Sequence, residues 1–345
     1  HIVTEIDLKT GCLVARNTYN YDFPGRVVFF DVNNAKSTFT ADRSEFIGRN
    51  GSLEKPSALD FKRLSGRVGA GLDPCAAIQV PVELEDGEER EISFRLGQGR
   101  DIADARILIN RYRDVKERRS ANDLVHGFWR DVLNVVQVNT PDQSLNMLAN
   151  GWLLYQVLSC RLFGRSGYYQ SGGAYGFRDQ LQDCMSLVHS RPSLLREQIL
   201  RSASRQFSEG DVQHWWHPPG NRGVRTQCSD DFLWLPLATS RYVKATGDTG
   251  ILDESLFFIT GRQVNDEEDS YYDQPGQSNE SGTLYEHCVR AIKHGLRFGV
   301  NGLPLMGCGD WNDGMNLVGV KGKGESVWLA FFTYQVLDHF EEVAN

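Results

Sequence analysis

The residues most able to do chemistry stand in one short run, Gly307 to Gly314, which reads Gly-Cys-Gly-Asp-Trp-Asn-Asp-Gly. Two carboxylates, Asp310 and Asp313, flank Trp311, and the glycines allow tight turns and close approach of a ligand. An indole offers an apolar face to a sugar ring, and a carboxyl group in apolar surroundings can keep its proton near neutral pH. Cleavage of a glycosidic bond needs such an acid. The alternative is a turn in which Asp and Asn bond to their own backbone.

A second polar cluster stands where a helix should begin. Arg178, Gln182 and Asp183 supply donors and acceptors suited to sugar hydroxyls, and carboxylates near a helix N-terminus gain from its dipole. Arg165 adds a cation a few residues earlier. The alternative is a surface ion pair between Arg178 and Asp179, together with helix capping.

The third cluster sets adjacent tryptophans beside histidines, within the run Glu209–Pro219. Trp215 and Trp216 could wall a sugar site together with His214, and one of the two tryptophans should anchor the loop in the core. His214 and His217 have no obvious third ligand nearby, so a metal site is not predicted.

Weaker signals complete the search. Asp230 and Asp231 open a predicted helix, where capping is the favoured interpretation. The sequence has no GxSxG elbow, no P-loop and no GxGxxG at a strand–helix junction, so the common hydrolase and nucleotide-binding motifs are not represented. We predict no organic cofactor.

Length and composition set the class of protein. A chain of 345 residues is expected to form two domains, and 40% hydrophobic with 24% charged residues is typical of a soluble globular protein. The formal net charge of -8 argues against a nucleic-acid partner, and no window is apolar enough to span a bilayer. Seven dispersed cysteines without CxxC spacing indicate reduced thiols and a cytoplasmic location.

The first hundred residues have β character. Short runs rich in Val, Ile and Phe are separated by turn signals such as Asn50-Gly51 and Asp86-Gly87, which favours a β-sandwich. The expected strands are Arg26–Val32, Cys75–Leu84 and Arg90–Leu96.

From about Asp101 the apolar residues recur every three or four positions, as in helices. Thr283 with Glu286 predicts a capping box, and Gly247 stands where a helix should end. The expected helices are Ala103–Tyr112, Ala121–Val136, Ser144–Leu162, Phe177–His189, Ser193–Phe207, Asp230–Thr246, Thr249–Ile259, Thr283–Phe298 and Ser326–Val343.

The helices leave long loops over 164–176, 208–229, 260–281 and 299–325, rich in Gly and aromatic residues. Loops of this length inside a compact domain are usually functional. A β domain followed by an all-α domain therefore fits better than a βαβ sheet.

The ends of the sequence suggest a piece of a longer polypeptide. The chain opens at His1 without a methionine or a signal-peptide pattern, and it closes at Asn345 inside an expected helix.

Taken together, these runs resemble glycoside hydrolase family 94, the inverting β-glucoside phosphorylases. The similarity covers nearly the whole chain and is strongest toward the C-terminal module of cyclic β-1,2-glucan synthases and toward β-1,2-oligoglucan phosphorylases. It rests on the segments Phe39–Arg43, Phe46–Gly51, Gly69–Cys75, Asn150–Gln156, Phe177–Asp183, Gly210–Pro219, Ser229–Pro236 and Gly309–Gly314.

The resemblance implies the C-terminal part of a β-sandwich over 1–100, a helical linker over 101–140 and an (α/α)6 barrel catalytic domain over 141–345, here incomplete at the C-terminus. By motif, Asp313 takes the general-acid position, while Trp311 and Asp183 line the donor-sugar subsite. Arg178 and Arg165 match basic residues near the donor sugar or phosphate. Asp310, Gln182, Trp215 and His214 complete the set of substrate-binding residues that we predict.

Phosphorolysis explains why one assigned acid is enough. An inverting hydrolase needs a second carboxylate, roughly 6.5–9.5 Å away, to activate water. Inorganic phosphate is already a nucleophile, and with Asp313 as the base the reaction can run backwards from glucose 1-phosphate. The expected partners are therefore a β-glucan oligosaccharide and phosphate.

Two departures from the family pattern qualify this picture. Gly176 stands where disaccharide phosphorylases tend to carry a phosphate-binding arginine, and the remaining phosphate ligands would lie beyond Asn345. The alternatives are an inverting β-glucan hydrolase and a glucan-binding or chain-length-control module of a larger synthase at the cytoplasmic face of the inner membrane. A homodimer is allowed for.

Overall fold

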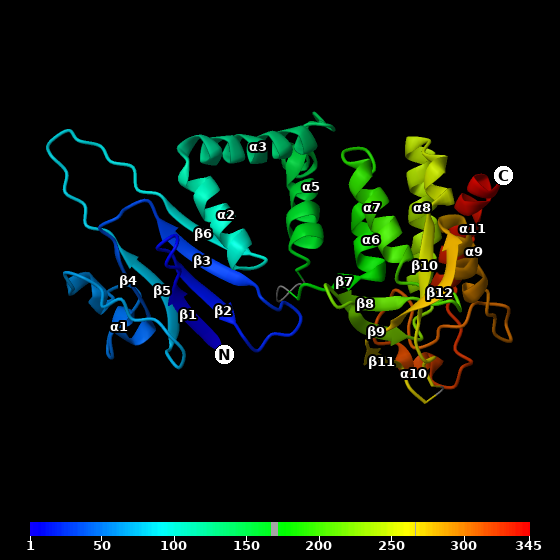
Figure 1. Ribbon diagram of the computed structural model, residues 1–345. Coiled ribbons are helices and arrows are strands. Elements are labelled where there is room, and N and C mark those ends of the chain that lie inside the picture. The colour runs from blue at the N-terminus through cyan, green and yellow to red at the C-terminus, as the bar shows by residue number, and fades with distance from the viewer. Residues whose placement is uncertain (167–171, 266) are drawn as a thin grey trace. The chain divides into compact units, whose positions relative to one another are not determined.

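The computed structural model describes residues 1–166, 172–265 and 267–345. It has two compact units, His1–Gly127 and Phe128–Asn345 (Figure 1). Strands dominate the first unit and helices the second, which confirms the expected order of a β domain followed by a helical one. The division falls inside helix α3 (Val115–Leu133), within the range where the sequence predicts a linker.

The first unit is built on an antiparallel sheet in the order β1-β2-β3-β6. Helix α2 packs on this sheet because Ala105 and Ile109, one turn apart, are both fully buried against Val27 and Phe29 of β3. The elements are β1 Ile2–Ile6, β2 Leu13–Asn17, β3 Val27–Val32, β4 Thr38–Asp42, α1 Arg43–Ile47, β5 Pro74–Gln79, β6 Phe94–Gly99 and α2 Ile102–Arg113.

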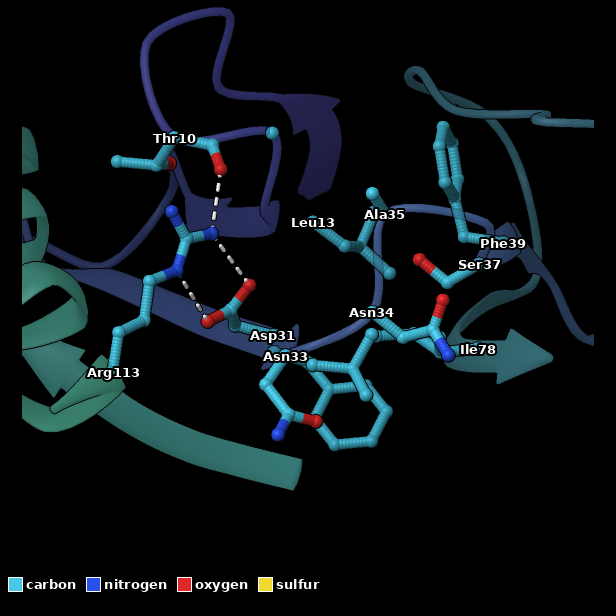
Figure 2. Close-up of a pocket in the computed structure, with 13 residues that line it drawn as sticks. Thr10, Leu13, Asp31, Asn33, Asn34, Ala35, Ser37, Phe39, Ile78 and Arg113 are labelled. Carbon is cyan, nitrogen blue, oxygen red and sulfur yellow. Dashed lines mark hydrogen bonds and ion pairs between the residues drawn. The ribbon is translucent and has the colours of Figure 1, made fainter. Parts of the chain in front are cut away.

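A cavity of about 520 Å³, lined by both polar and apolar side chains, opens beside the main sheet of the first unit. Figure 2 shows Arg113 on one side of it, beside the carbonyl of Thr10 and the carboxylate of Asp31. Arg113 donates to these two groups at 2.6 and 2.8 Å. Asp31 also accepts from Arg95, at 2.8 Å. These arginines neutralise a buried carboxylate and connect α2 to the sheet.

The second unit is held by a core in which helices α6, α7, α8, α9 and α11 share buried apolar side chains. Leu181, Leu195, Leu235 and Val336 are fully buried there. The helices are α4 Gln143–Met147, α5 Leu153–Gln156, α6 Phe177–Met185, α7 Pro192–Ala203, α8 Trp234–Thr246, α9 Leu284–Gly295, α10 Asn316–Gly319 and α11 Val327–Ala344.

Strands occupy several segments that the sequence analysis left as loops. A sheet in the order β11-β9-β8-β7 and a pair β10-β12 lie among the helices. The expected helix Thr249–Ile259 is wrong, because only a short 3-10 turn, Thr249–Asp253, precedes strand β10. The strands are β7 Tyr175–Gly176, β8 Gln213–His217, β9 Arg222–Thr226, β10 Ser255–Thr260, β11 Ser270–Asp273 and β12 Gly276–Thr283.

Two of the predicted end signals, Gly247 and Thr283, are observed, although the Glu286 carboxylate expected in the capping box pairs with Arg290. Gly247 closes α8 in the left-handed conformation, with φ of 72°. Thr283 caps α9 by accepting from the amide of Glu286 at 3.2 Å. Among the described residues, no helix is both long enough and apolar enough to cross a bilayer.

Candidate active site

The acid-bearing loop, residues 307–314, is fastened to the segment that follows β9. Cys308 donates its amide to the Gln227 carbonyl at 3.2 Å, and the amide of Ser229 donates to the Gly309 carbonyl at 2.9 Å. Gly307 has φ of +63°, and a Cβ at this position would lie 2.0 Å from the Gln227 carbonyl oxygen. Glycine is therefore required where the two backbones meet.

Asp310 shapes this loop from the inside. It is 1% exposed, and its Oδ1 accepts from the amide and side-chain nitrogens of Asn312, at 2.8 and 3.0 Å. Its Oδ2 accepts from the Ser326 hydroxyl at 2.5 Å, and Ser326 caps helix α11. The turn interpretation therefore describes Asp310 well. Its carboxylate is fully engaged inside the protein, so the structure gives it a positioning contact in place of the sugar contact that we expected.

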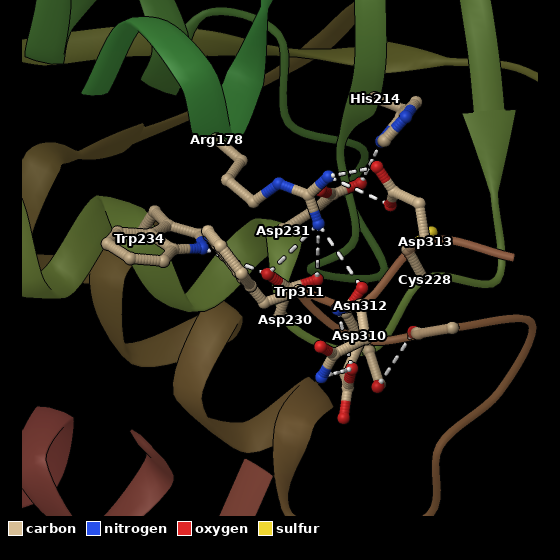
Figure 3. A network of polar contacts seen from close by, with 12 residues as sticks. Arg178, His214, Cys228, Asp230, Asp231, Trp234, Asp310, Trp311, Asn312 and Asp313 are labelled. Carbon is tan, nitrogen blue, oxygen red and sulfur yellow. Dashed lines mark hydrogen bonds and ion pairs between the residues drawn. The ribbon is translucent and has the colours of Figure 1, made fainter. Parts of the chain in front are cut away.

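Arg178 is the centre of the polar network (Figure 3). Its Nη2 donates to both carboxylate oxygens of Asp313 at 2.9 Å, and its Nη1 donates to Asp230 and to the Asp310 carbonyl, each at 3.3 Å. The Arg178 side chain, in the first turn of α6, is only 9% exposed. The alternative of a surface pair with Asp179 is therefore wrong. A buried arginine instead connects three segments distant in sequence.

The paired acids Asp230 and Asp231 belong to this network, so the capping interpretation is wrong for both. Asp230 makes no cap hydrogen bond and accepts from Arg178 and, at 3.0 Å, from the indole nitrogen of Trp234. Complete burial, with the charge of Asp231 beside it, raises the pKa of Asp230 above its ordinary range, although Arg178 opposes the shift. The sequence signal that could have identified this role was a pair of acidic residues inside an otherwise apolar run.

His214 reaches the network from strand β8. Its Nδ1 lies 2.6 Å from Oδ2 of Asp231. Burial disfavours the imidazolium, but the Asp231 carboxylate outweighs it and raises the pKa of His214 to about 9. Donor atoms of His214, Asp231 and Cys228 lie within 4.8 Å of one another. A divalent cation would have to displace the proton of His214, and His217 turns elsewhere, with its Nε2 3.1 Å from the Gly172 carbonyl.

Asp313 itself faces solvent. Its side chain is 68% exposed, and both oxygens accept from Arg178. Trp311 is 48% exposed, and its indole nitrogen lies 3.3 Å from Oε1 of Gln182. The apolar enclosure expected around the acid is thus not observed in this state. An open, charge-paired carboxylate stands next to an exposed indole.

Asp183 lies five residues beyond Arg178 on α6, next to Gln182, whose side chain contacts Trp311. Arg161 donates to it at 2.6 Å, and burial raises the pKa of Asp183 in spite of that pairing. Arg161 also lies 3.8 Å from Asp179. The sequence analysis missed Arg161, which stands in a helical stretch without other polar signals.

Two predicted residues contact other parts of the unit. Arg165 donates to the Gly173 carbonyl at 2.9 Å and stacks over the ring of Tyr175. Trp215 packs against His217 and Tyr272, with ring centroids 5.3 and 5.5 Å apart.

The expected anchoring tryptophan is Trp216. It is 1% exposed and stacks on Tyr175 with ring centroids 5.5 Å apart. Its neighbour Trp215 remains partly accessible, because successive side chains of β8 point to opposite faces. The prediction that one of the two tryptophans serves the core is confirmed.

The arrangement can exchange a proton at an exposed carboxylate. Arg178 holds Asp313 in place, while the buried acids Asp230 and Asp231 offset the charges of Arg178 and His214. A substrate hydroxyl or glycosidic oxygen could approach the solvent side of Asp313. The exposed Trp311 beside it offers a flat apolar surface for a sugar ring.

Comparisons with known proteins show the family of the chain. Residues 128–345 match the model of the glycosyl hydrolase 94 superfamily catalytic domain, and residues 1–115 match the glycosyl hydrolase 94 supersandwich domain. The chain is 44% identical over 342 residues to the cyclic β-(1,2)-glucan synthase NdvB of Rhizobium meliloti, covering 98% of this chain and 12% of that protein.

Two phosphorylases are also similar. The N,N'-diacetylchitobiose phosphorylase of Vibrio proteolyticus is 26% identical over 343 residues, which cover 90% of this chain and 40% of that protein. The 1,2-β-oligoglucan phosphorylase of Listeria innocua is 27% identical over 206 residues, which cover 57% of this chain and 18% of that protein. The chain thus spans well under half the length of these relatives.

Proposed function

Because the chain belongs to the glycosyl hydrolase 94 family, we propose that it catalyses the reversible, inverting phosphorolysis of β-glucosidic bonds. The substrate that we propose is a β-1,2-linked glucan, and the product is α-glucose 1-phosphate. The similarity to a cyclic β-(1,2)-glucan synthase and to a 1,2-β-oligoglucan phosphorylase supports this linkage.

In the proposed mechanism Asp313 is the general acid. It gives its proton to the departing glucosidic oxygen while inorganic phosphate attacks the anomeric carbon from the opposite face. In the reverse reaction the Asp313 carboxylate takes the proton from the attacking sugar hydroxyl. The observation that carries this assignment is that Asp313 is the solvent-exposed member of a network whose other acids, Asp230, Asp231 and Asp310, are buried.

The contact between Arg178 and Asp313 adds a requirement. Both carboxylate oxygens accept from Arg178, so at least one must leave the arginine before it can carry the transferred proton. Binding of a sugar oxygen to Arg178 would release Asp313 for proton transfer. We propose that Arg178 donates hydrogen bonds to Asp313 when the site is empty and to the substrate when the site is occupied.

The remaining predicted residues are proposed to bind the substrate. Trp311 would stack on the sugar, and Gln182 and Asp183 would bind its hydroxyls. His214, Trp215 and Arg165 would contact more distant sugar units or phosphate. We assign Asp310 to positioning of the loop. No organic cofactor enters the reaction, and inorganic phosphate is the co-substrate.

The test is phosphorolysis of β-1,2-glucan oligosaccharides by the intact protein. We predict that Asp313→Asn lowers turnover at least about a hundredfold, because the general acid is lost. Formation of α-glucose 1-phosphate is the measurement, and Asp253→Asn, at an exposed aspartate outside the network, is the control. Near-normal turnover of Asp313→Asn would remove Asp313 from its role.

The same assay separates the alternatives. Free glucose released without phosphate would indicate an inverting hydrolase. Oligosaccharide binding without turnover in either direction would indicate a glucan-binding or chain-length-control module.

A further inference from the structure

Two thiols lie close together where the acid-bearing loop pairs with the segment that follows β9. Cys228, two residues after the end of β9, and Cys308, two residues before Asp310, have their Sγ atoms 3.6 Å apart. Backbone hydrogen bonds hold the two segments together, and Cys228 pairs with Gly307 as an isolated β-bridge. A disulfide has an S–S distance of about 2 Å. A displacement of about 1.5 Å would therefore join these sulfurs.

The geometry around Cys308 permits such a displacement. Rotation about the Cα–Cβ bonds of the two cysteines can bring the sulfurs closer while the hydrogen-bonded backbone stays in place. The two thiols are partly buried, and they face one another across segments that are already paired. The two cysteines are 80 residues apart in sequence. The fold brings them together, and no local spacing motif in the sequence predicts that they are close.

A small oxidant can reach this pair. Cys308 lines a cavity of about 640 Å³, together with Gln227, Asp269, Arg297 and Lys321. Glu267 and Glu268 also line it, so the lining holds three carboxylates and two cationic side chains. This lining should admit a small neutral oxidant more readily than an anionic one.

The two thiols are not equivalent. A hydrogen bond from Cys228 lowers the pKa of the Cys308 thiol, although burial opposes the shift. The same contact, burial and the nearby Asp231 raise the pKa of the Cys228 thiol. Since the thiolate is the nucleophile, Cys308 is the attacking group and Cys228 the second thiol.

We propose that Cys228 and Cys308 form a thiol–disulfide site that a neutral peroxide closes. The Cys308 thiolate attacks one oxygen of hydrogen peroxide, which leaves a sulfenic acid at Cys308 and releases hydroxide. The Cys228 thiol then attacks the sulfenic sulfur, and the S–S bond forms as water leaves. The two sulfurs together lose two electrons and the peroxide gains them. A dithiol reductant reverses the reaction.

Closure of this site would add a covalent connection between two parts of the polar network. Cys228 lies two residues before Asp230, and Cys308 lies five residues before Asp313. In the reduced protein the loop is held to this segment by hydrogen bonds to Gln227 and Ser229. The disulfide would restrain the movement by which Asp313 leaves Arg178.

The test is peroxide treatment of the native protein, followed by alkylation of free thiols and tryptic digestion without reduction. Cys228 and Cys308 fall in the tryptic peptides 226–241 and 298–321, and each peptide contains no other cysteine. We expect these two peptides to be recovered joined, lighter than their sum by two hydrogens. Titration of the denatured Cys160→Ser protein, which lacks the exposed thiol, should show four free thiols in place of six, and dithiothreitol should restore them.

Matched variants make the result specific. A Cys160→Ser background removes an exposed thiol that peroxide can oxidise by itself. In that background Cys308→Ser should lose the joined peptide. With both cysteines present, oxidised glutathione should form the disulfide more slowly than hydrogen peroxide does. Recovery of 226–241 and 298–321 as separate alkylated peptides would overturn the proposal, and so would their joining to other cysteines.

A second measurement reports on the loop. Hydrogen exchange of the amides over 309–316 should slow in the oxidised protein and return to its original rate on reduction, while peroxide leaves it unchanged in Cys308→Ser. Unchanged exchange after disulfide formation would overturn the restraint on the loop. Neither measurement depends on phosphorolysis, so a failure here is distinct from a failure of the proposed function.

Discussion

At the scale of residues, the decisive feature is one arginine shared by two carboxylates of different character. Arg178 donates to the exposed Asp313 and to the fully buried Asp230. A planar guanidinium can hold both partners through separate nitrogens, whereas an ammonium is a single point of charge. The side chain at this position therefore sets the geometry of the acid as well as the local charge.

We predict that Arg178→Lys lowers kcat/KM for phosphorolysis at least about tenfold while the protein stays folded. The lysine keeps a positive charge near Asp230, but it cannot also fix Asp313. Steady-state kinetics checks the effect, with Arg241→Lys, an exposed position on α8, as the control. Equal kinetics for the two variants would contradict the central role of Arg178.

The pair of His214 and Asp231 gives a prediction about pH. Because the folded pKa of about 9 lies above the ordinary 6.5, the pair stabilises the protein fully below pH 6.5, and this stabilisation is lost as pH rises toward 9. The difference in free energy of unfolding between the native protein and His214→Gln should shrink over that range, from a value on the order of 3 kcal/mol. Denaturant unfolding at several pH values measures it.

His287 provides a control of opposite sign. Burial lowers its pKa to about 4, so its contribution is present above pH 6.5 and is lost as pH falls toward 4. The difference between the native protein and His287→Gln should therefore shrink on acidification. The same sign for both variants would contradict the assigned protonation states.

The site residues could be predicted from the sequence only where neighbouring residues in the chain carried the signal. The runs around Asp313 and Arg178 could be singled out by composition, and the turn at Asp310 follows from its neighbours. The partners of these residues could not be identified, since Arg178 and Asp230 are 52 positions apart and Arg178 and Asp313 are 135 apart. For the same reason Asp230 and Asp231 were given a local role that the fold does not use.

At the scale of elements, the acid-bearing loop depends on close backbone contacts. A Cβ on Gly319, at the end of α10, would lie 1.6 Å from the carbonyl oxygen of Gly307. Gly307 in turn lies against Gln227. The loop that presents Asp313 is therefore braced from both sides by positions that exclude a side chain.

We predict that Gly319→Ala destabilises the protein by about 1–3 kcal/mol and also lowers turnover, because the backbone at Gly307 must move. Thermal unfolding and phosphorolysis should be measured together. The control is Gly322→Ala, three residues after Gly319. Nothing lies within 4 Å of the carbon added there, so only the left-handed φ of +64° destabilises the variant, by about 1 kcal/mol. If the two variants behave alike, close packing at Gly319 is not what holds the loop.

The prediction of elements succeeded for helices and was poorer for strands in the second unit. Helix α8 ends at the predicted Thr246 but begins four residues later than expected, and both ends of α9 lie within three residues of the expected range. The Ser255–Thr260 run was assigned to a helix, although its Leu, Phe and Ile residues suit a strand as well. The β8–β9 hairpin had a readable signal in Pro218 to Asn221, which separates two aromatic and β-branched runs.

At the scale of the whole molecule, two separate cores are joined by a continuous chain. Ile109 belongs to a small cluster between α2 and the sheet of the first unit, and Leu195 to the large helical core of the second. Both side chains are fully buried. The division of the chain at Gly127 leaves each of these clusters entirely on one side.

We therefore predict that a cavity in one core lowers the stability of that unit alone. Ile109→Ala should cost about 2–5 kcal/mol and lower the unfolding temperature of residues 1–127, and Leu195→Ala should do the same for residues 128–345. Hydrogen exchange followed by mass spectrometry during heating assigns each transition to its peptides. Because Asp313, Arg178 and His214 all lie in the second unit, Ile109→Ala should leave their network intact below the first transition. A single transition that moves equally in both variants would show that the two cores unfold as one.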